Sequence, residues 1–131
     1  MTPPARSDLV QRLCAAVAIL FGIVTLIQGG RVLGGADPGY VVFRPLLLFN
    51  VAMGAVYIAA GIVIWRALAS GRKFAGAIFL LNLLVLAGIA LLWQGGGAVA
   101  TQSLGAMSFR TILWLALFLV LGWRLRRGAA G

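Results

Sequence analysis

Apolar residues occupy four long stretches of the chain, and basic residues or glycine-rich segments separate these stretches. The first, third and fourth stretches cover residues 13–30, 74–93 and 104–123. The second begins between residues 39 and 45 and ends at residue 65. Each approaches the ~20 residues that an α-helix needs to cross ~30 Å of hydrocarbon. None has the alternation of apolar and polar residues that is typical of a membrane β-strand. The pattern predicts an all-α integral membrane protein, with residues 1–131 forming one bundle of four transmembrane helices.

The composition favours the same interpretation. Of the 131 residues, 63% are hydrophobic and 10% are charged. A soluble domain of this length leaves a large part of its surface in water and could not bury so many apolar side chains. Lipid can solvate them, so we expect the long apolar stretches to be membrane spans.

The net charge of +9 would suggest a nucleic-acid partner in a soluble protein. Here the basic residues lie in short clusters beside the apolar stretches, where such residues set orientation and contact anionic headgroups. We therefore expect membrane lipids as partners, and no nucleic acid. Other membrane subunits or self-association are further partners that the sequence allows.

Basic residues are distributed unequally between the two predicted membrane faces. Three fall on one face: Arg31, Arg44 and Arg110. The other eight lie near the two termini and in the central connection: Arg6, Arg12, Arg66, Arg72, Lys73, Arg124, Arg126 and Arg127. Because basic loops stay in the cytoplasm, we expect both termini to be cytoplasmic. The richness in Arg, Ala and Gly suggests a bacterial cytoplasmic (inner) membrane.

The residues that usually carry catalysis are missing from the sequence. It contains no His and no Glu, its only acidic residues are Asp8 and Asp37, and its only cysteine is Cys14. General-base catalysis, metal ligation and disulfide bonding therefore lack their usual groups within one chain. We expect a protein that is not an enzyme and binds no metal or cofactor. Cys14 is predicted to be a small buried hydrophobic residue.

An internal repeat at an offset of 66 residues is the most specific feature of the sequence. Residues 22–44 match residues 88–110 without gaps at nine of 23 positions, and the matches include Gln-Gly-Gly and Phe-Arg at equal spacing. The pattern predicts two helix hairpins, about residues 6–66 and 72–131, that insert in the same orientation.

The repeat places Gln28, Gln94, Arg44 and Arg110 near the outer ends of the four helices. Counted from the basic residues at the inner boundary, Arg110, Gln28 and Asn50 lie ~21–24 Å above it, within the outer leaflet. The same count places Arg44 at ~33 Å, about two helical turns further out than the repeat predicts.

An arginine inside a span is costly unless it reaches the headgroups, finds partners or faces water. One interpretation is that Arg110 extends to the headgroups and Arg44 lies in the interface. The other is that Arg110, Gln28, Asn50, Gln94 and Arg44 line a cavity open to the outer face. Such a cavity would favour an anionic or carbonyl-bearing ligand, such as a lipid headgroup or a quinone. Asp37, in the outer loop, is the candidate counter-ion.

A second polar pair is predicted nearer the inner face. Tyr57 and Asn82 both lie nine residues from a basic boundary residue, so both are expected ~13 Å from the inner boundary. If their helices form a hairpin, the hydroxyl and the amide can bond across it as a structural contact. A substrate contact is the alternative.

These expectations favour a non-catalytic multi-pass membrane protein, either an accessory subunit or a module that binds a lipid or quinone. The alternative is a small transporter or channel for an anion or an amphiphile.

Overall fold

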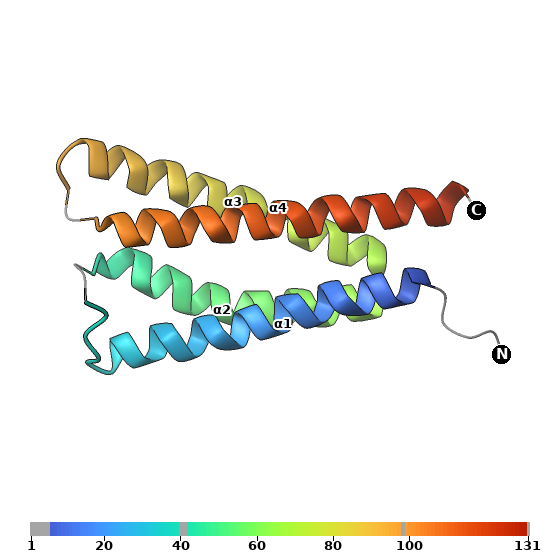
Figure 1. Ribbon diagram of the computed structural model, residues 1–131, viewed down its shortest axis with the longest axis horizontal. Coiled ribbons are helices and arrows are strands. Elements are labelled where there is room, and N and C mark those ends of the chain that lie inside the picture. The colour runs from blue at the N-terminus through green and yellow to red at the C-terminus, as the bar shows by residue number, and fades with distance from the viewer. Residues whose placement is uncertain (1–5, 40–41, 98, 131) are drawn as a thin grey trace.

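The computed structural model describes the backbone of residues 6–39, 42–97 and 99–130, and the side chains of residues 9–39, 42–97 and 99–127. Four α-helices make up most of this part of the chain (Figure 1): α1 (Arg6–Leu33), α2 (Arg44–Arg66), α3 (Leu68–Gln94) and α4 (Thr101–Ala130). All four are long and apolar enough to cross a membrane. The predicted all-helical architecture of four helices is confirmed, and it is compatible with a small multi-pass membrane protein.

The helices form two hairpins that lie against each other. α1 packs along α2 and α3 packs along α4, while α2 and α3 join the hairpins and α1 meets α4 over a shorter stretch. Both hairpin turns lie at one end of the bundle, which we call the loop end. The start of α1, the end of α4 and the α2–α3 connection lie at the other, which we call the terminal end (Figure 1).

Glycines with positive φ end the first helix of each hairpin. Gly35 has a φ of +107° after α1, and Gly96 has a φ of +82° after α3. In both turns a backbone N–H reaches back five residues, from Ala36 to the Arg31 carbonyl (3.0 Å) and from Gly97 to the Leu92 carbonyl (2.7 Å). This geometry satisfies helix-end carbonyls and needs a left-handed residue, which glycine supplies.

The connection between α2 and α3 is shorter than predicted. Only Ala67 separates the helices, in an extended conformation with φ −146° and ψ 110°. The predicted start of the third span at residue 74 is therefore wrong, because α3 begins at Leu68 and already contains Arg72 and Lys73. At the other end of α2, Pro45 lies in the first turn, where its missing N–H leaves no helical hydrogen bond unmade.

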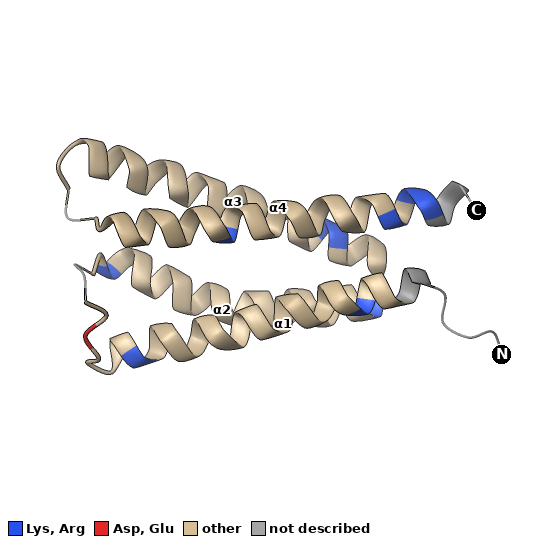
Figure 2. Ribbon diagram, in the orientation of Figure 1, with Lys and Arg blue, Asp and Glu red and all other residues tan. Residues whose placement is uncertain are grey.

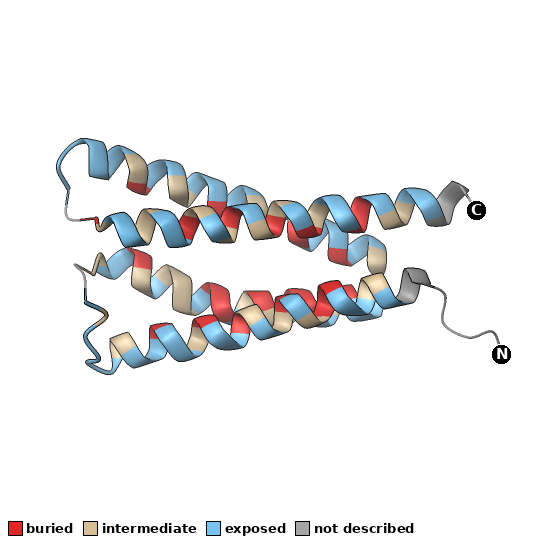
Figure 3. Cartoon of the chain, viewed as in Figure 1, coloured by how far each residue is buried: buried red, intermediate tan, exposed pale blue. Residues whose placement is uncertain are grey.

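Buried residues concentrate on the faces that the helices turn towards one another, and the outward faces are exposed (Figure 3). Many of the exposed side chains are large and hydrophobic. The largest fully buried side chains include Trp114, Tyr57 and Ile64. Leu84 and Leu91 on α3 are each 70% exposed. Outward-facing leucines are what lipid, but not water, can solvate. Cys14 is a buried free cysteine.

Charged residues concentrate at the two ends of the bundle, and the terminal end is the more basic (Figure 2). Arg12, Arg66, Arg72, Lys73, Arg124, Arg126 and Arg127 lie towards the terminal end, whereas the loop end carries Arg31, Arg44 and Asp37. The side chain of Arg6, another residue of the predicted basic face, lies outside the described residues, as does that of Asp8.

The duplication stays a prediction, because matching residues occupy different elements. Gly30 is helical in α1, but its match Gly96 forms the turn after α3. Arg44 is the first residue of α2, whereas its match Arg110 lies nine residues after the start of α4 at Thr101. A duplication predicts that α1 pairs with α2 and α3 with α4, as observed. It also predicts that the helices end at matching residues, which they do not.

Candidate functional site

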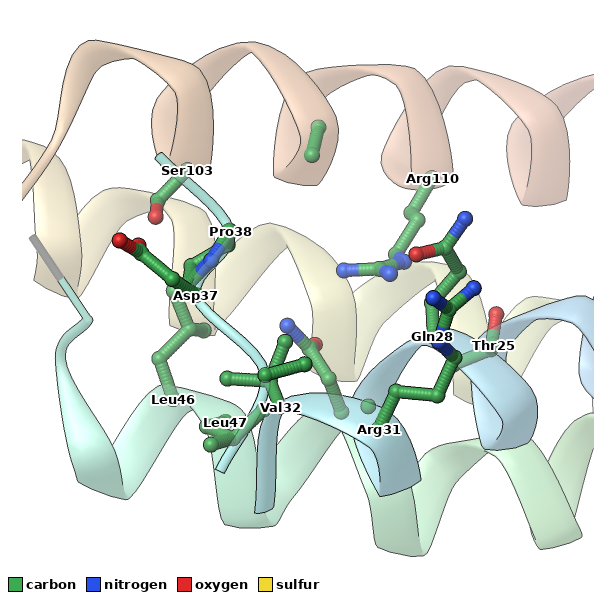
Figure 4. A pocket seen from close by; sticks show the side chains of 14 residues that line it. Thr25, Gln28, Arg31, Val32, Asp37, Pro38, Leu46, Leu47, Ser103 and Arg110 are labelled. Carbon is green, nitrogen blue, oxygen red and sulfur yellow. The ribbon is translucent and has the colours of Figure 1, made fainter. Parts of the chain in front are cut away.

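A pocket of about 320 Å³ lies at the loop end, between α1, α2, α4 and the loop after α1 (Figure 4). We call it the loop-end pocket. Its polar lining side chains are Thr25, Gln28, Arg31, Asp37, Asn50, Ser103 and Arg110. Two guanidinium groups and one carboxylate give this lining a net positive charge.

Arg110 enters the pocket from well inside α4. It follows Thr101 by nine residues, which places it ~13 Å along the helix axis, within the apolar span of α4. The side chain is half-buried, and its guanidinium carbon lies 6.0 Å from the centre of the Phe21 ring. The negative face of an aromatic ring attracts a cation. Phe21 therefore helps to hold this charge between α4 and α1.

Arg31 and Gln28 bring further donors to the same end of the pocket. Both come from the last two turns of α1, and both are exposed. Figure 4 shows their polar groups gathered with that of Arg110 at one end of the pocket. Guanidinium and carboxamide N–H groups can together surround a phosphate or carboxylate, and Arg can do so with two parallel hydrogen bonds.

The opposite end of the pocket is acidic. Asp37 lies beside Ser103 there, away from Arg110 (Figure 4). Asp37 Oδ1 accepts a hydrogen bond of 2.8 Å from the backbone N–H of Gly39, which fixes the loop conformation. The carboxylate keeps further acceptor capacity, because an ionised carboxyl group offers about four lone-pair sites.

Asn50 contributes an unused acceptor. Its side chain lines the pocket from α2, and its Oδ1 is buried without a hydrogen-bond partner among the described residues. A buried polar atom left in this way costs free energy. A ligand that donates a hydrogen bond to Asn50 would recover that cost.

The structure brings three of the five predicted ligand-binding residues to one pocket and leaves two outside it. Arg110, Gln28 and Asn50 line the pocket, whereas Arg44 and Gln94 are not among its lining residues. Arg44 is exposed at the start of α2, and Gln94 is exposed as the last residue of α3. The structure therefore does not bring all five residues to one pocket, and a ligand-binding role for Arg44 and Gln94 stays a prediction.

Thr25, Arg31 and Ser103 line the pocket but were not predicted to do so. Thr25 precedes Gln28 by three residues and Ser103 precedes Arg110 by seven, and both spacings place residues on one face of a helix. That spacing could have identified the two hydroxyl groups. Arg31 follows Gln28 by three residues and lies on the same face, and its guanidinium turns back along α1 from the last turn (Figure 4).

An aromatic cluster packs next to the Arg110 guanidinium, which lies over the Phe21 ring. The ring centre of Phe21 lies 5.4 Å from that of Tyr57 and 5.9 Å from that of Phe109. Tyr57 in turn lies 5.0 Å from Trp114, and both of these side chains are completely buried. The cluster therefore holds α1, α2 and α4 together beside the pocket residue Arg110.

The second predicted polar pair includes one of these rings, Tyr57. The Tyr57 hydroxyl donates a hydrogen bond of 3.3 Å to Asn82 Oδ1, and the bond is buried. It joins α2 to α3. Neither residue lines the loop-end pocket.

Another polar contact, which the sequence analysis did not predict, joins α1 to the terminal end of α2. Gln11 Nε2 donates to the backbone carbonyl of Ile64 at 2.7 Å and is 3.3 Å from that of Trp65. These carbonyls belong to the last turn of α2 and have no helical N–H to accept. Gln11 therefore acts as a cap supplied by a neighbouring helix.

No group of three or more His, Cys, Asp or Glu side chains that could hold a metal ion occurs within the described residues. Comparison of the chain with protein-family models, with curated proteins and with solved structures found no match.

Proposed function

We propose that this protein is a non-catalytic membrane protein that binds the anionic or carbonyl-bearing group of an amphiphile in the loop-end pocket. The observation that carries the proposal is the convergence of Arg110, Arg31 and Gln28 on one cavity inside the apolar spans. A charged group at that depth is costly unless it is paired or faces a polar cavity. An anionic ligand in this cavity could accept hydrogen bonds from both guanidinium groups.

The depth of the pocket supports an amphiphile. Ser103 and Arg110 are seven residues apart on α4, so the pocket extends over ~10 Å of the helix axis. A ligand in this range would have its polar group below the end of α4 and its apolar part beside lipid. Phospholipids and isoprenoid quinones are both amphiphiles, because each carries a polar group on an apolar chain.

The distribution of basic residues supports an orientation with the terminal end in the cytoplasm and the loop-end pocket in the outer leaflet of a bacterial inner membrane. Labelling of single cysteines in a Cys14→Ala background would test it. Thr101→Cys, an exposed residue at the loop end, should react with a membrane-impermeant maleimide added outside spheroplasts, and Ala67→Cys should react only after lysis. The reverse pattern would overturn the orientation.

Native mass spectrometry of the protein extracted from membranes tests the binding proposal. Arg110→Ala should reduce the fraction of protein that retains lipid or quinone about tenfold, because it removes charge-assisted hydrogen bonds to the ligand. Arg44→Ala is the matched control, since it removes an exposed arginine outside the pocket. Equal retention by the wild-type protein and both variants would favour the other interpretation, in which Arg110 only reaches the headgroups.

A further inference from the structure

The loop-end pocket has two poles of opposite charge. Arg31, Arg110 and Gln28 form the cationic pole, and Asp37 with Ser103 forms the acidic pole (Figure 4). A simple anion would use only the first of these. The acidic pole needs a ligand group that carries positive charge or donates hydrogen bonds.

We infer that the loop-end pocket takes the headgroup of a zwitterionic aminophospholipid, with the phosphate at the cationic pole and the primary ammonium group at the acidic pole. The inference rests on the proposed function and names the ligand class for the same pocket. In phosphatidylethanolamine, a two-carbon link separates the phosphate from an ammonium group. The two charges of the headgroup therefore match the order of charges along the pocket.

Hydrogen-bonding capacity selects the ammonium group over other headgroups. An –NH₃⁺ group has three donors. The Asp37 carboxylate and the Ser103 hydroxyl can accept them at the acidic pole (Figure 4). Choline carries the same charge but has no N–H donor. Glycerol has donors but no positive charge to complement Asp37.

The walls of the pocket favour entry from the lipid rather than from water. Residues 36–38 of the loop after α1 line the pocket, so this loop forms part of its wall at the loop end. Gln28 on α1 and Ala106 on α4 line the pocket but are exposed, and these two helices meet over only a short stretch. A headgroup can therefore enter sideways between α1 and α4.

The surface below this entrance suits an acyl chain. Val24 lies one turn below Gln28 on α1 and is 53% exposed, and Phe109 lies one turn below Ala106 on α4 and is 59% exposed. An acyl chain that leaves the entrance would run over these two apolar side chains. The pocket would thus hold the headgroup while the tail remains in the outer part of the bilayer.

A competition in nanodiscs tests the headgroup assignment. The discs contain equal amounts of phosphatidylethanolamine, phosphatidylglycerol and phosphatidylcholine with identical tails, and retained lipid is measured by native mass spectrometry. The wild-type protein should retain phosphatidylethanolamine about tenfold over each of the others, the size of effect that a charge-assisted hydrogen bond produces. Equal retention of the three lipids would overturn the inference.

Asp37→Asn is the diagnostic variant. Asparagine keeps the oxygen that accepts from the Gly39 N–H, so the loop conformation is preserved, but the negative charge is lost. Retention of phosphatidylethanolamine should fall to the level of phosphatidylcholine, whereas Arg110→Ala should lower retention of all three lipids. A preference that survives in Asp37→Asn contradicts the two-pole assignment and leaves the proposed function intact. Unchanged retention in Arg110→Ala contradicts the proposed function itself.

A bulky side chain at the entrance tests sideways entry. Ala106→Trp should lower phosphatidylethanolamine retention several-fold, because the indole would fill the space between α1 and α4 at the pocket. Ala116→Trp is the control, since Ala116 is exposed on the same helix and does not line the pocket. Equal retention in both variants, with soluble glycerophosphoethanolamine displacing the lipid, would mean that the headgroup enters from water instead.

Discussion

The two hairpins share sequence features but pack their helices by different means. In the α1–α2 hairpin, a Cβ added at Gly22 would lie 2.7 Å from the Gly54 carbonyl oxygen and 2.9 Å from the Ile58 nitrogen. Backbone therefore lies against backbone. At the matching residue of the α3–α4 hairpin, Gly88, an added Cβ would meet nothing within 4 Å.

The α3–α4 hairpin uses glycine against a side chain instead. A Cβ added at Gly76 would lie 2.8 Å from Phe118 Cε1, and the atoms nearest to it all belong to the Phe118 ring. A ring can rotate or shift, whereas a backbone can move only with its helix. The first hairpin is therefore the rigid unit, and we expect it to tolerate substitution less well than the second.

The same comparison applies to the matched arginines. Arg44 begins α2 and is exposed, whereas Arg110 lies inside α4 and lines the pocket. Because α4 begins nine residues earlier than the register predicts, one guanidinium group lies at the helix end and the other within the span. An identical residue in an aligned position thus has a different role when the helix boundary moves.

The largest expected effect is at Gly22. Gly22→Ala forces α1 and α2 apart and should lower the free energy of unfolding by ~2–3 kcal/mol, as overpacking of a tight interface does. The measurement is unfolding in mixed micelles followed by circular dichroism. Gly88→Ala, the matched control, should leave the free energy of unfolding unchanged or raise it by up to ~1 kcal/mol, since alanine is the better helix former. Equal losses in the two variants would refute the contrast between the hairpins.

A smaller effect is expected at Gly76. Gly76→Ala should lower the free energy of unfolding by ~1 kcal/mol, because the Phe118 ring can yield where the Gly54 backbone cannot. The double variant Gly76→Ala with Phe118→Leu should recover part of the loss in the same unfolding experiment. If Gly76→Ala costs as much as Gly22→Ala, the second hairpin is as rigid as the first.

The smallest effect is expected at the bond between the hairpins. Tyr57→Phe removes the donor to Asn82 and should lower the free energy of unfolding by ~0.6 kcal/mol, the average for hydrogen bonds between membrane helices. Lipid retention should stay at the wild-type level, because Tyr57 does not line the pocket. A loss of lipid retention without a loss of stability would assign Tyr57 to ligand binding.

The features of this fold that follow from a single physical rule can be predicted from the sequence. The length and apolarity of the spans predict four helices because lipid demands internally satisfied backbones. Depth counting also placed Arg110, Gln28 and Asn50 at similar levels, and these three residues do share the pocket. Counting works here because the rise per residue of a helix is fixed.

The remaining features depend on where each helix ends and on the direction in which loop side chains point, and the sequence specifies neither. Gly30 and Gly96 sit in identical Gln-Gly-Gly segments, yet only Gly96 ends a helix, and α1 continues to Leu33. The choice between several adjacent glycines depends on what the turn packs against. The acidic pole also depends on loop conformation, because Asp37 reaches the pocket through its turn with Gly39.

The most direct test of the binding site is a crystal structure grown from a lipidic mesophase doped with phosphatidylethanolamine. The account predicts phosphate density within hydrogen-bonding distance of the guanidinium groups of Arg110 and Arg31, with the ammonium group beside Asp37. A loop-end pocket that contains only water, with lipid phosphates bound instead beside Arg44, would contradict it.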